Sequence, residues 1–168
     1  GQPGRPDCDT VGGVSVDVRD WVRDWAKGDD LSRYWRLFYR RERTESRILR
    51  SLLTPILLRS ARRHGGYIGI GAVIREPPVL PHGLHGVYIS RYAAVGAGCR
   101  IYQNVTIGEV DGAAPEIGDG CLIGAGAVIV GGVKIGSHVK IGAGAVVCTD
   151  VPEGSTVVAQ PARILPGR

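Results

Sequence analysis

The chain has 168 residues and a formal net charge of +5, enough for one catalytic-size domain with a small appendage. The charge is uneven, because residues 1–66 carry 14 Lys or Arg and 9 Asp or Glu, whereas residues 67–168 carry 7 of each. No recognised nucleic-acid-binding motif accompanies the basic excess, and no apolar run reaches the ~20 residues of a transmembrane helix. We therefore expect neither a nucleic-acid-binding protein nor one that spans a membrane.

The first third of the chain is predicted to be a loose start followed by helices. Residues 1–13 are polar and rich in Gly and Pro, with no visible secretion signal. The four cysteines show no metal or redox spacing, so we expect free thiols and a cytoplasmic protein. Helical spacing then appears at Val18, Trp21, Val22 and Trp25. A second, aromatic-rich helix follows around Tyr34–Phe38, with Asp30 or Ser32 as its cap.

A third helix is predicted from Glu45 to His64, kinked or split at Pro55 because proline lacks the amide hydrogen. We expect one apolar stripe on it, made of Ile48, Leu49, Leu52, Leu53, Ile56 and Leu57. Five arginines accompany the stripe: Arg47, Arg50, Arg59, Arg62 and Arg63. They suit an anionic membrane surface or nucleic acid, but we favour a helix packed on the next domain or a neighbouring subunit. Membrane contact stays open as the less favoured alternative.

After Gly65-Gly66 the sequence is organised by a repeat of six residues. β-Branched residues recur at that step in two ladders: Ile89, Val95, Ile101, Ile107, and then Ile117, Ile123, Ile129, Ile135, Ile141, Val147. A period of six is neither helical nor simply alternating. Three short strands with Gly-containing corners close a coil of about eighteen residues, and coils stack roughly 4.8 Å apart. The fold class is therefore mainly β, a parallel β-helix over residues 67–168 after a helical segment over 1–66.

Two interruptions of the repeat are candidate sites, since insertions in repeat proteins form loops. One, residues 75–86, holds His82 and His85 beside glycines, and an imidazole is well suited to take a proton from a hydroxyl. The other is residues 109–115, where the ladder step from Ile107 is ten. Farther on, residues 150–154 are expected to leave the β-helix and residues 159–165 to fold back along it.

Two identical pentapeptides, Ile123–Ala127 and Ile141–Ala145, lie one full coil apart and should stack directly. Their small residues would form a shallow track in which a pantetheine arm can bond backbone groups. Small residues are also what tight corners need, so the track has a purely structural explanation as well.

These motifs resemble the hexapeptide-repeat acyltransferases, and within them the serine O-acetyltransferases. The matching segments are His82–Gly86, Tyr102–Gly108, Ile123–Ala127 and Gln160–Ile164, so the resemblance covers about residues 67–165. It implies a left-handed β-helix, a homotrimer with active sites between subunits, acetyl-CoA as donor, and no metal. It also implies a histidine base, which we assign to His82 in preference to His85.

The donor site combines the stacked pentapeptides with what the resemblance implies. Thr106 and Gly108 would lie near the thioester, Lys140 near a phosphate, and Pro161 and Arg163 near the adenine. The predicted set is Thr106, Gly108, Gly124, Ala125, Ala127, Lys140, Gly142, Ala143, Pro161 and Arg163.

The chain also departs from the family pattern. Pro81 replaces the family's Asp before the catalytic His, and the family's second Asp, which orients the base, falls near Gly66 or Tyr67. Another acceptor must therefore hold the imidazole tautomer, and Glu76 and Glu109 are the candidates. Residues 113–115, Ala-Ala-Pro, stand where the family has Arg-His-Pro, which helps hold the amino-acid substrate. An unpaired serine carboxylate would bind weakly.

The departures lead to a main hypothesis and three alternatives. We predict direct acetyl transfer to a small hydroxyl acceptor, in particular a sugar or saccharide. Serine O-acetyltransferase activity and an inactive assembly partner remain alternatives. A zinc carbonic anhydrase is disfavoured because the four histidines lack its spacing.

Overall fold

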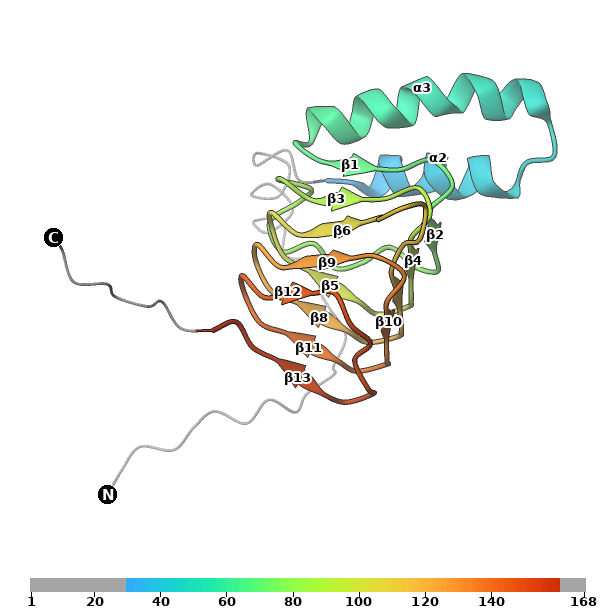
Figure 1. Cartoon of the computed structure of the whole chain (residues 1–168). Helices are drawn as coiled ribbons and strands as arrows, with labels where there is room; N and C mark the ends of the chain where they lie inside the picture. The colour runs from blue at the N-terminus through green and yellow to red at the C-terminus, as the bar shows by residue number, and fades with distance from the viewer. Residues whose placement is uncertain (1–29, 161–168) are drawn as a thin grey trace, which may run out of the picture.

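The computed structural model describes residues 30–160, which form two helices lying across one end of a β-helix (Figure 1). The helix predicted around Val18–Trp25, together with Pro161 and Arg163, lies outside the described residues. The helices are α2 (Ser32–Arg43) and α3 (Arg47–Arg63). Within residues 30–160 neither helix has the length and hydropathy needed to cross a membrane.

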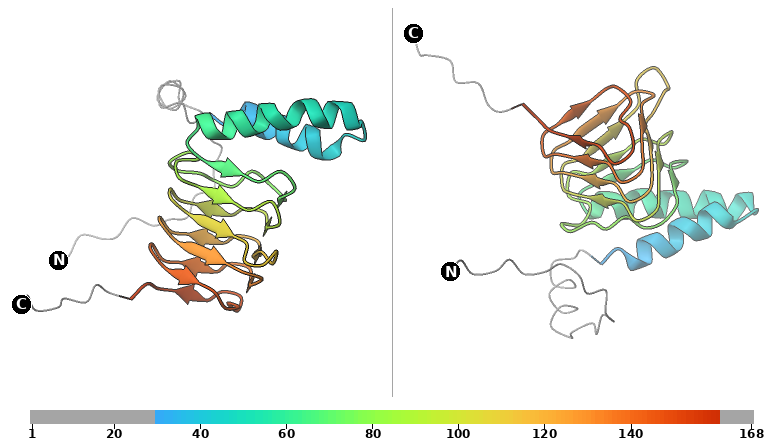
Figure 2. Two further views of the ribbon diagram at one scale, coloured as in Figure 1. Left: turned by 45° about the horizontal axis from the view of Figure 1, so that its top comes forward. Right: turned by 90° about the horizontal axis from the view of Figure 1, so that it is seen from below.

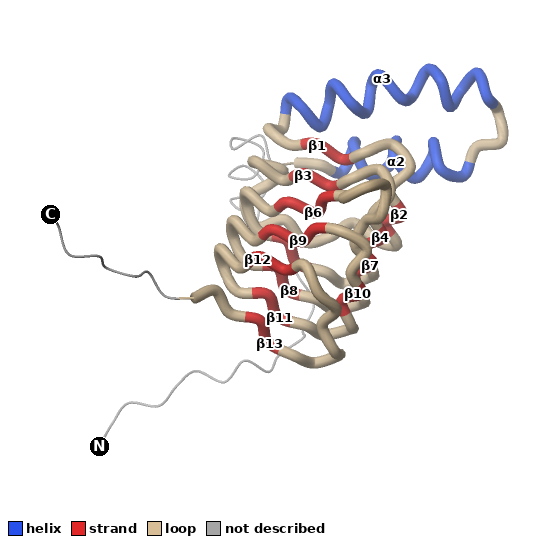
Figure 3. The backbone as a smooth tube through the Cα atoms, viewed as in Figure 1, coloured by secondary structure: helices blue, strands red, loops and turns tan. Residues whose placement is uncertain are grey.

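The strands are short, and all thirteen belong to three parallel sheets. Sheet A consists of β1 (Tyr67–Ile68), β3 (Tyr88–Ile89), β6 (Thr106–Gly108), β9 (Val128–Val130) and β12 (Val146–Val147). Sheet B consists of β2 (Val73–Ile74), β4 (Ala94–Val95), β7 (Glu116–Ile117) and β10 (Lys134–Ile135). Sheet C consists of β5 (Arg100–Ile101), β8 (Leu122–Ile123), β11 (Lys140–Ile141) and β13 (Thr156–Val157). The chain passes from sheet A to B to C and back to A, so the predicted parallel β-helix is confirmed (Figures 2 and 3).

The ladder residues point inward, as the six-residue period predicted. Ile89, Ile107 and Ile129 are register partners in sheet A, and each is fully buried. Each two-residue strand has one outward and one inward residue, because successive side chains of a strand face opposite ways. Gly65-Gly66 connects the helical segment to the β-helix, since α3 ends at Arg63 and β1 begins at Tyr67.

The expectation that residues 150–154 leave the β-helix is wrong. Val151 is buried and pairs with Ile135, and β13 pairs with β11, so the chain completes another coil. The reason is the free edge that β11 would otherwise present: its unpaired backbone groups are satisfied by one more strand.

The helix α3 is one continuous element with Pro55 inside it, so the predicted split does not occur. Its buried side consists of Leu53, Leu57 and Ala61, which lie four residues apart on one face. The predicted single stripe is therefore wrong, because Ile48, Leu52 and Ile56 form a different line that is 50–76% exposed. The Ser46 hydroxyl caps the helix by accepting a hydrogen bond from the Leu49 amide (3.3 Å).

Helix α2 is amphipathic and contributes the aromatic part of the core. Its buried residues are Tyr34, Trp35 and Phe38, which contact one another edge-on or stacked. The N-cap of α2 is Leu31 rather than Asp30 or Ser32. The Asp30 carboxylate nevertheless accepts a hydrogen bond from the Ser32 amide (2.9 Å). Helices α2 and α3 pack on each other, and α3 also packs on β1. The five arginines named in the prediction all lie on α3, at one end of the β-helix.

Candidate active site

The loop that carries His82 and His85 (residues 82–86, here called the histidine loop) and the two pentapeptides lie on the same edge of the β-helix. This edge is the corner between sheets C and A, where the chain enters β3, β6, β9 and β12. Backbone hydrogen bonds connect its successive levels: Asn104 N to His85 O (2.9 Å), Gly126 N to Gln103 O (3.0 Å), and Gly144 N to Ala125 O (2.9 Å). We call this edge the C–A corner, made of residues 82–86, 102–104, 124–126 and 142–144.

The pentapeptides stack directly, as predicted from their spacing. A Cβ on Gly124 would lie 2.6 Å from the Ala143 amide nitrogen, so only glycine allows this approach of the two backbones. Asn104 occupies the same corner position as Gly126 and Gly144 with φ 58, a left-handed conformation that asparagine tolerates. Small side chains and tight corners thus leave a shallow surface over two levels of the corner.

The histidine loop is held by buried apolar side chains and a backbone hydrogen bond, and both of its imidazoles lie at the surface. Leu84 and Val87 are 1% exposed, and the Gly86 amide donates to Gly65 O (2.8 Å). His82 and His85 are both exposed. The centroid of the His82 ring lies 6.0 Å from that of Tyr102, one level along the corner, with the rings tilted by 51°.

Several predicted donor-site residues gather at the C–A corner. Thr106 is half-buried at the start of β6, and Lys140 is exposed two residues before the corner glycine Gly142. Ala127 differs, since it is fully buried and its backbone groups bond Thr106 N and Gly124 O. Its side chain is therefore not accessible to a ligand on the surface. Gly108 ends β6, at the far side of sheet A from the corner.

Neither candidate carboxylate lies at the C–A corner. Glu109 follows β6, whereas the histidine loop precedes β3, and these two strands are parallel neighbours, so the two segments lie at opposite ends of sheet A. The pKa of Tyr88 is raised mainly by burial and secondly by the nearby Glu109 carboxylate. Glu76 follows β2, where the chain leaves sheet B toward sheet C, so it lies at a different corner from the histidine loop. The sequence did not reveal this separation because residues 75–86 break the repeat.

The four-residue insertion is a tight loop between β6 and β7. Val110 and Ala113 exchange both backbone hydrogen bonds (2.9 and 3.0 Å), and Asp111 and Gly112 make the turn with positive φ. Ala113 is exposed and Ala114 is half-buried. The loop therefore presents short apolar side chains rather than the charged pair that the family pattern has there.

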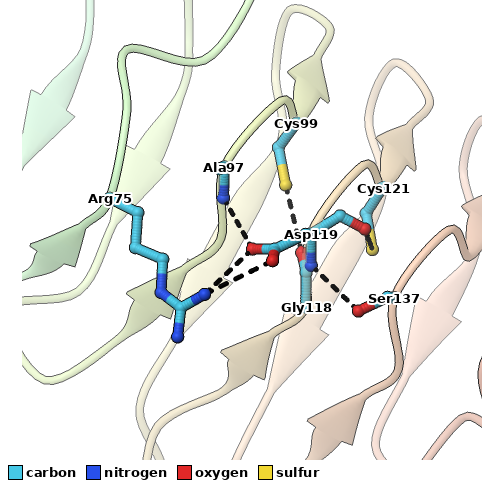
Figure 4. A network of polar contacts seen from close by, with 7 residues as sticks. All are labelled: Arg75, Ala97, Cys99, Gly118, Asp119, Cys121 and Ser137. Carbon is cyan, nitrogen blue, oxygen red and sulfur yellow. Dashed lines mark hydrogen bonds and ion pairs between the residues drawn. The ribbon is translucent and has the colours of Figure 1, made fainter.

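A second polar cluster lies at the corner between sheets B and C, away from His82 and His85 (Figure 4). The Asp119 carboxylate accepts hydrogen bonds from the Ala97 amide (2.8 Å) and from Arg75 (3.3 Å). The buried Cys99 thiol donates to Gly118 O (3.2 Å), and its contact with Cys121 and then its burial raise its pKa. The neighbouring groove on sheet B has a volume of about 330 Å³. We interpret the cluster as structural, because its polar groups bond the backbone of adjacent coils.

This interpretation makes a prediction about stability. Asp119→Ala should lower the free energy of unfolding by about 1 kcal/mol, because the Ala97 amide loses its acceptor. Arg75→Gln should cost less than that, since the Arg75–Asp119 pair is 67% and 46% exposed. Urea denaturation of both variants measures the difference, and an equal loss in the two would contradict it.

Among residues 30–160 no three His, Cys, Asp or Glu side chains come together where they could hold a metal ion. The C–A corner itself offers exposed imidazoles, small corner residues and backbone groups.

Comparison with known proteins agrees with this arrangement. Residues 114–149 match the family described as bacterial transferase hexapeptide (six repeats). This part of the β-helix therefore matches the hexapeptide-repeat family. Its relatives include serine acetyltransferase 5 of Arabidopsis thaliana, 53% identical over 87 residues, which are 49% of this chain and 28% of that protein. A serine acetyltransferase of Staphylococcus aureus is 43% identical over 99 residues, covering 56% of this chain and 46% of the relative.

Solved structures of serine acetyltransferases share the fold of this β-helix. The soybean apoenzyme aligns with a TM-score of 0.61 and 38% identity, over 70% of this chain and 50% of that one. The Neisseria gonorrhoeae enzyme in complex with serine aligns with a TM-score of 0.62 and 29% identity, over 92% and 78%. The chain spans less than half the length of these two curated relatives. The resemblance inferred from the motifs is confirmed.

Proposed function

We propose that the chain is an acetyl-CoA-dependent O-acetyltransferase and that its acceptor is serine. The observation that carries the proposal is the C–A corner, where backbone hydrogen bonds link the histidine loop, residues 102–104 and both pentapeptides. An imidazole and a narrow surface for a thioester arm thus share one edge. The matching relatives are serine acetyltransferases, which supports an acyl-transfer reaction at that edge.

In the proposed reaction His82 accepts the proton of the acceptor hydroxyl. The hydroxyl oxygen forms a bond to the acetyl carbonyl carbon, the carbon–sulfur bond breaks, and CoA leaves as a thiol that takes up the proton. The exposed position of His82 beside Tyr102 supports access for an acceptor. Gly124, Ala125, Gly142 and Ala143 line the arm of the donor, and Lys140 meets its phosphates.

The sugar acceptor predicted from the sequence has less support than serine. The prediction depended on the loss of a charged pair in the loop at residues 113–115. However, the relatives at 43–53% identity are named serine acetyltransferases, and solved relatives have been crystallised with serine. Serine requires other groups to pair its carboxylate here, and arginine and lysine are the residues suited to that.

The test is a thiol-release assay with the full chain, acetyl-CoA and a panel of hydroxyl acceptors. We expect free CoA to appear with serine and O-acetylserine to be detected by mass spectrometry. Release with simple or nucleotide sugars, and none with serine, would restore the saccharide hypothesis. Absence of release with every acceptor would favour an inactive assembly partner.

The proposal includes a homotrimer with active sites between subunits. Light scattering of the full chain measures the mass, and a monomer that is fully active would contradict this part. In such a trimer the outer faces of the sheets, which are exposed in the single chain, would form the contacts between copies.

A further inference from the structure

Helix α3 has a line of large apolar side chains that no described residue covers. Ile48, Leu52 and Ile56 lie four residues apart on one face of the helix, and they are 76%, 61% and 50% exposed. The face that packs on α2 and β1 holds Leu53 and Leu57 instead. A helix that is apolar on two faces is normally covered on both, so the exposed line indicates a docking surface.

The same face of α3 becomes basic where the apolar line ends. Arg59 and Arg63 follow Ile56 at i+3 and i+7, and both are exposed. The helix contains no Asp or Glu, and no ion pair among residues 30–160 involves one of its arginines. An element that fits this face therefore combines apolar side chains with carboxylates.

The part of the chain that precedes α2 has this combination. The helix predicted around Val18–Trp25 has four apolar residues at helical spacing, two of them tryptophans. Residues 15–30 carry five Asp and three Lys or Arg, whereas α3 carries five Arg and no acidic residue. The charges of the two segments are thus opposite in sign.

The described chain begins close to the end of α3. Hydrogen bonds from Ser32 lower the pKa of the Asp30 carboxyl, and His64 lowers it further. His64 is the C-cap of α3, so the chain that leads into Asp30 arrives near the C-terminal end of this helix.

The lengths of the two surfaces also agree. At a rise of about 1.5 Å per residue, a helix from Val18 to Trp25 is about 10 Å long. The exposed line from Ile48 to Ile56 is about 12 Å long, and Ile56 lies about 10 Å from the C-terminal end of α3. The chain between Trp25 and Asp30 can extend over roughly 17 Å. Trp25 can therefore lie at Ile56, with the rest of the predicted helix running toward Ile48.

We propose that the helix predicted around Val18–Trp25 docks on α3 and covers Ile48, Leu52 and Ile56. The inference does not depend on the proposed function. Burial of the apolar side chains supplies most of the free energy of docking, since exposed ion pairs contribute little. The aspartates of the docked segment and the arginines of α3 favour this pairing over other surfaces.

The test is limited digestion of the full chain with trypsin, which cuts after Arg19, Arg23 and Lys27. Leu52→Glu places a carboxylate in the middle of the contact, where it has no partner and repels the aspartates. Cleavage at the three sites, followed by mass spectrometry, should become roughly tenfold faster or more, because cleavage follows the population in which the segment is undocked. Val158→Glu is the matched control: it adds the same charge at a side chain that is 75% exposed, directly after β13, and should leave these rates unchanged.

Tryptophan fluorescence gives a second measurement on the same variants. Trp35 is 7% exposed in the core of α2, so a change in emission reports mainly Trp21 and Trp25. We expect the emission to move to longer wavelength in Leu52→Glu and to stay unchanged in Val158→Glu.

Two rival occupants of the exposed line predict different results. If a second copy of the chain covers it, Leu52→Glu lowers the mass measured by light scattering and leaves tryptic cleavage unchanged. If a lipid surface covers it, the wild-type chain binds vesicles that contain phosphatidylserine, Leu52→Glu does not, and cleavage is again unchanged. Either result overturns the inference, as does rapid cleavage of the wild-type chain at the rate of Leu52→Glu. Faster cleavage in Leu52→Glu at the mass of the wild type supports it.

Discussion

Replacing His82 with alanine is expected to lower the rate of acetyl transfer by about 10²–10⁴-fold, the usual contribution of a general base. The reason is that the acceptor hydroxyl must lose its proton as its oxygen attacks the thioester, and alanine cannot take it. CoA binding should be nearly unchanged, because the donor arm is proposed to lie along residues 124–126 and 142–144. Steady-state release of CoA measures the rate, and calorimetry measures the binding.

Two other histidines serve as comparisons for this prediction. His85→Ala tests the second candidate base on the same loop, and we expect a smaller loss than for His82→Ala. His138 lies at the corner between sheets B and C with φ 58, so His138→Asn keeps a residue that tolerates this conformation. A larger loss in His85→Ala would move the base to that residue. Equal losses in all three variants would refute a specific histidine base.

The second large effect concerns the core of the β-helix. Ile107→Ala should lower the free energy of unfolding by about 2–5 kcal/mol, because the side chain is fully buried and its removal leaves a cavity. Its register partners Ile89 and Ile129 are held in place by the backbone ladder and cannot collapse into the space.

The matched control for the core is Val146→Ala on the same sheet. Val146 is 68% exposed, so its truncation should change stability by no more than about 0.5 kcal/mol. Urea denaturation of both variants at one protein concentration gives the comparison, since assembly makes stability depend on concentration. Comparable losses would show that the inward ladder is not the main source of stability.

The sequence was most informative where the repeat is regular. A six-residue step leaves one inward β-branched residue per strand, and this residue is buried at every ladder position. The stacking of the two pentapeptides also followed from their spacing of one coil. Both predictions depend only on local periodicity, which is why they were correct.

The sequence was least informative where the repeat is broken. The helix α3 has apolar residues on more than one face, and only packing on α2 and β1 decides that Leu53 and Leu57 are buried while Ile48 and Leu52 are exposed. The level occupied by His82 could not be counted, because residues 75–86 have no ladder. For the same reason the sequence could not show that Glu109 and the histidine loop lie at opposite ends of sheet A.

Periodicity was thus enough to predict the β-helix, its inward ladder and a stacked small-residue surface, because each depends on interactions that repeat with the chain. The tertiary structure was needed to bring the histidine loop to the same corner as that surface and to leave both carboxylate candidates elsewhere. The physical reason is that an irregular segment takes its place from the neighbours with which its backbone exchanges hydrogen bonds. In the loop of His82 and His85, the Gly86 amide donates to Gly65 O, and His85 O accepts from the Asn104 amide.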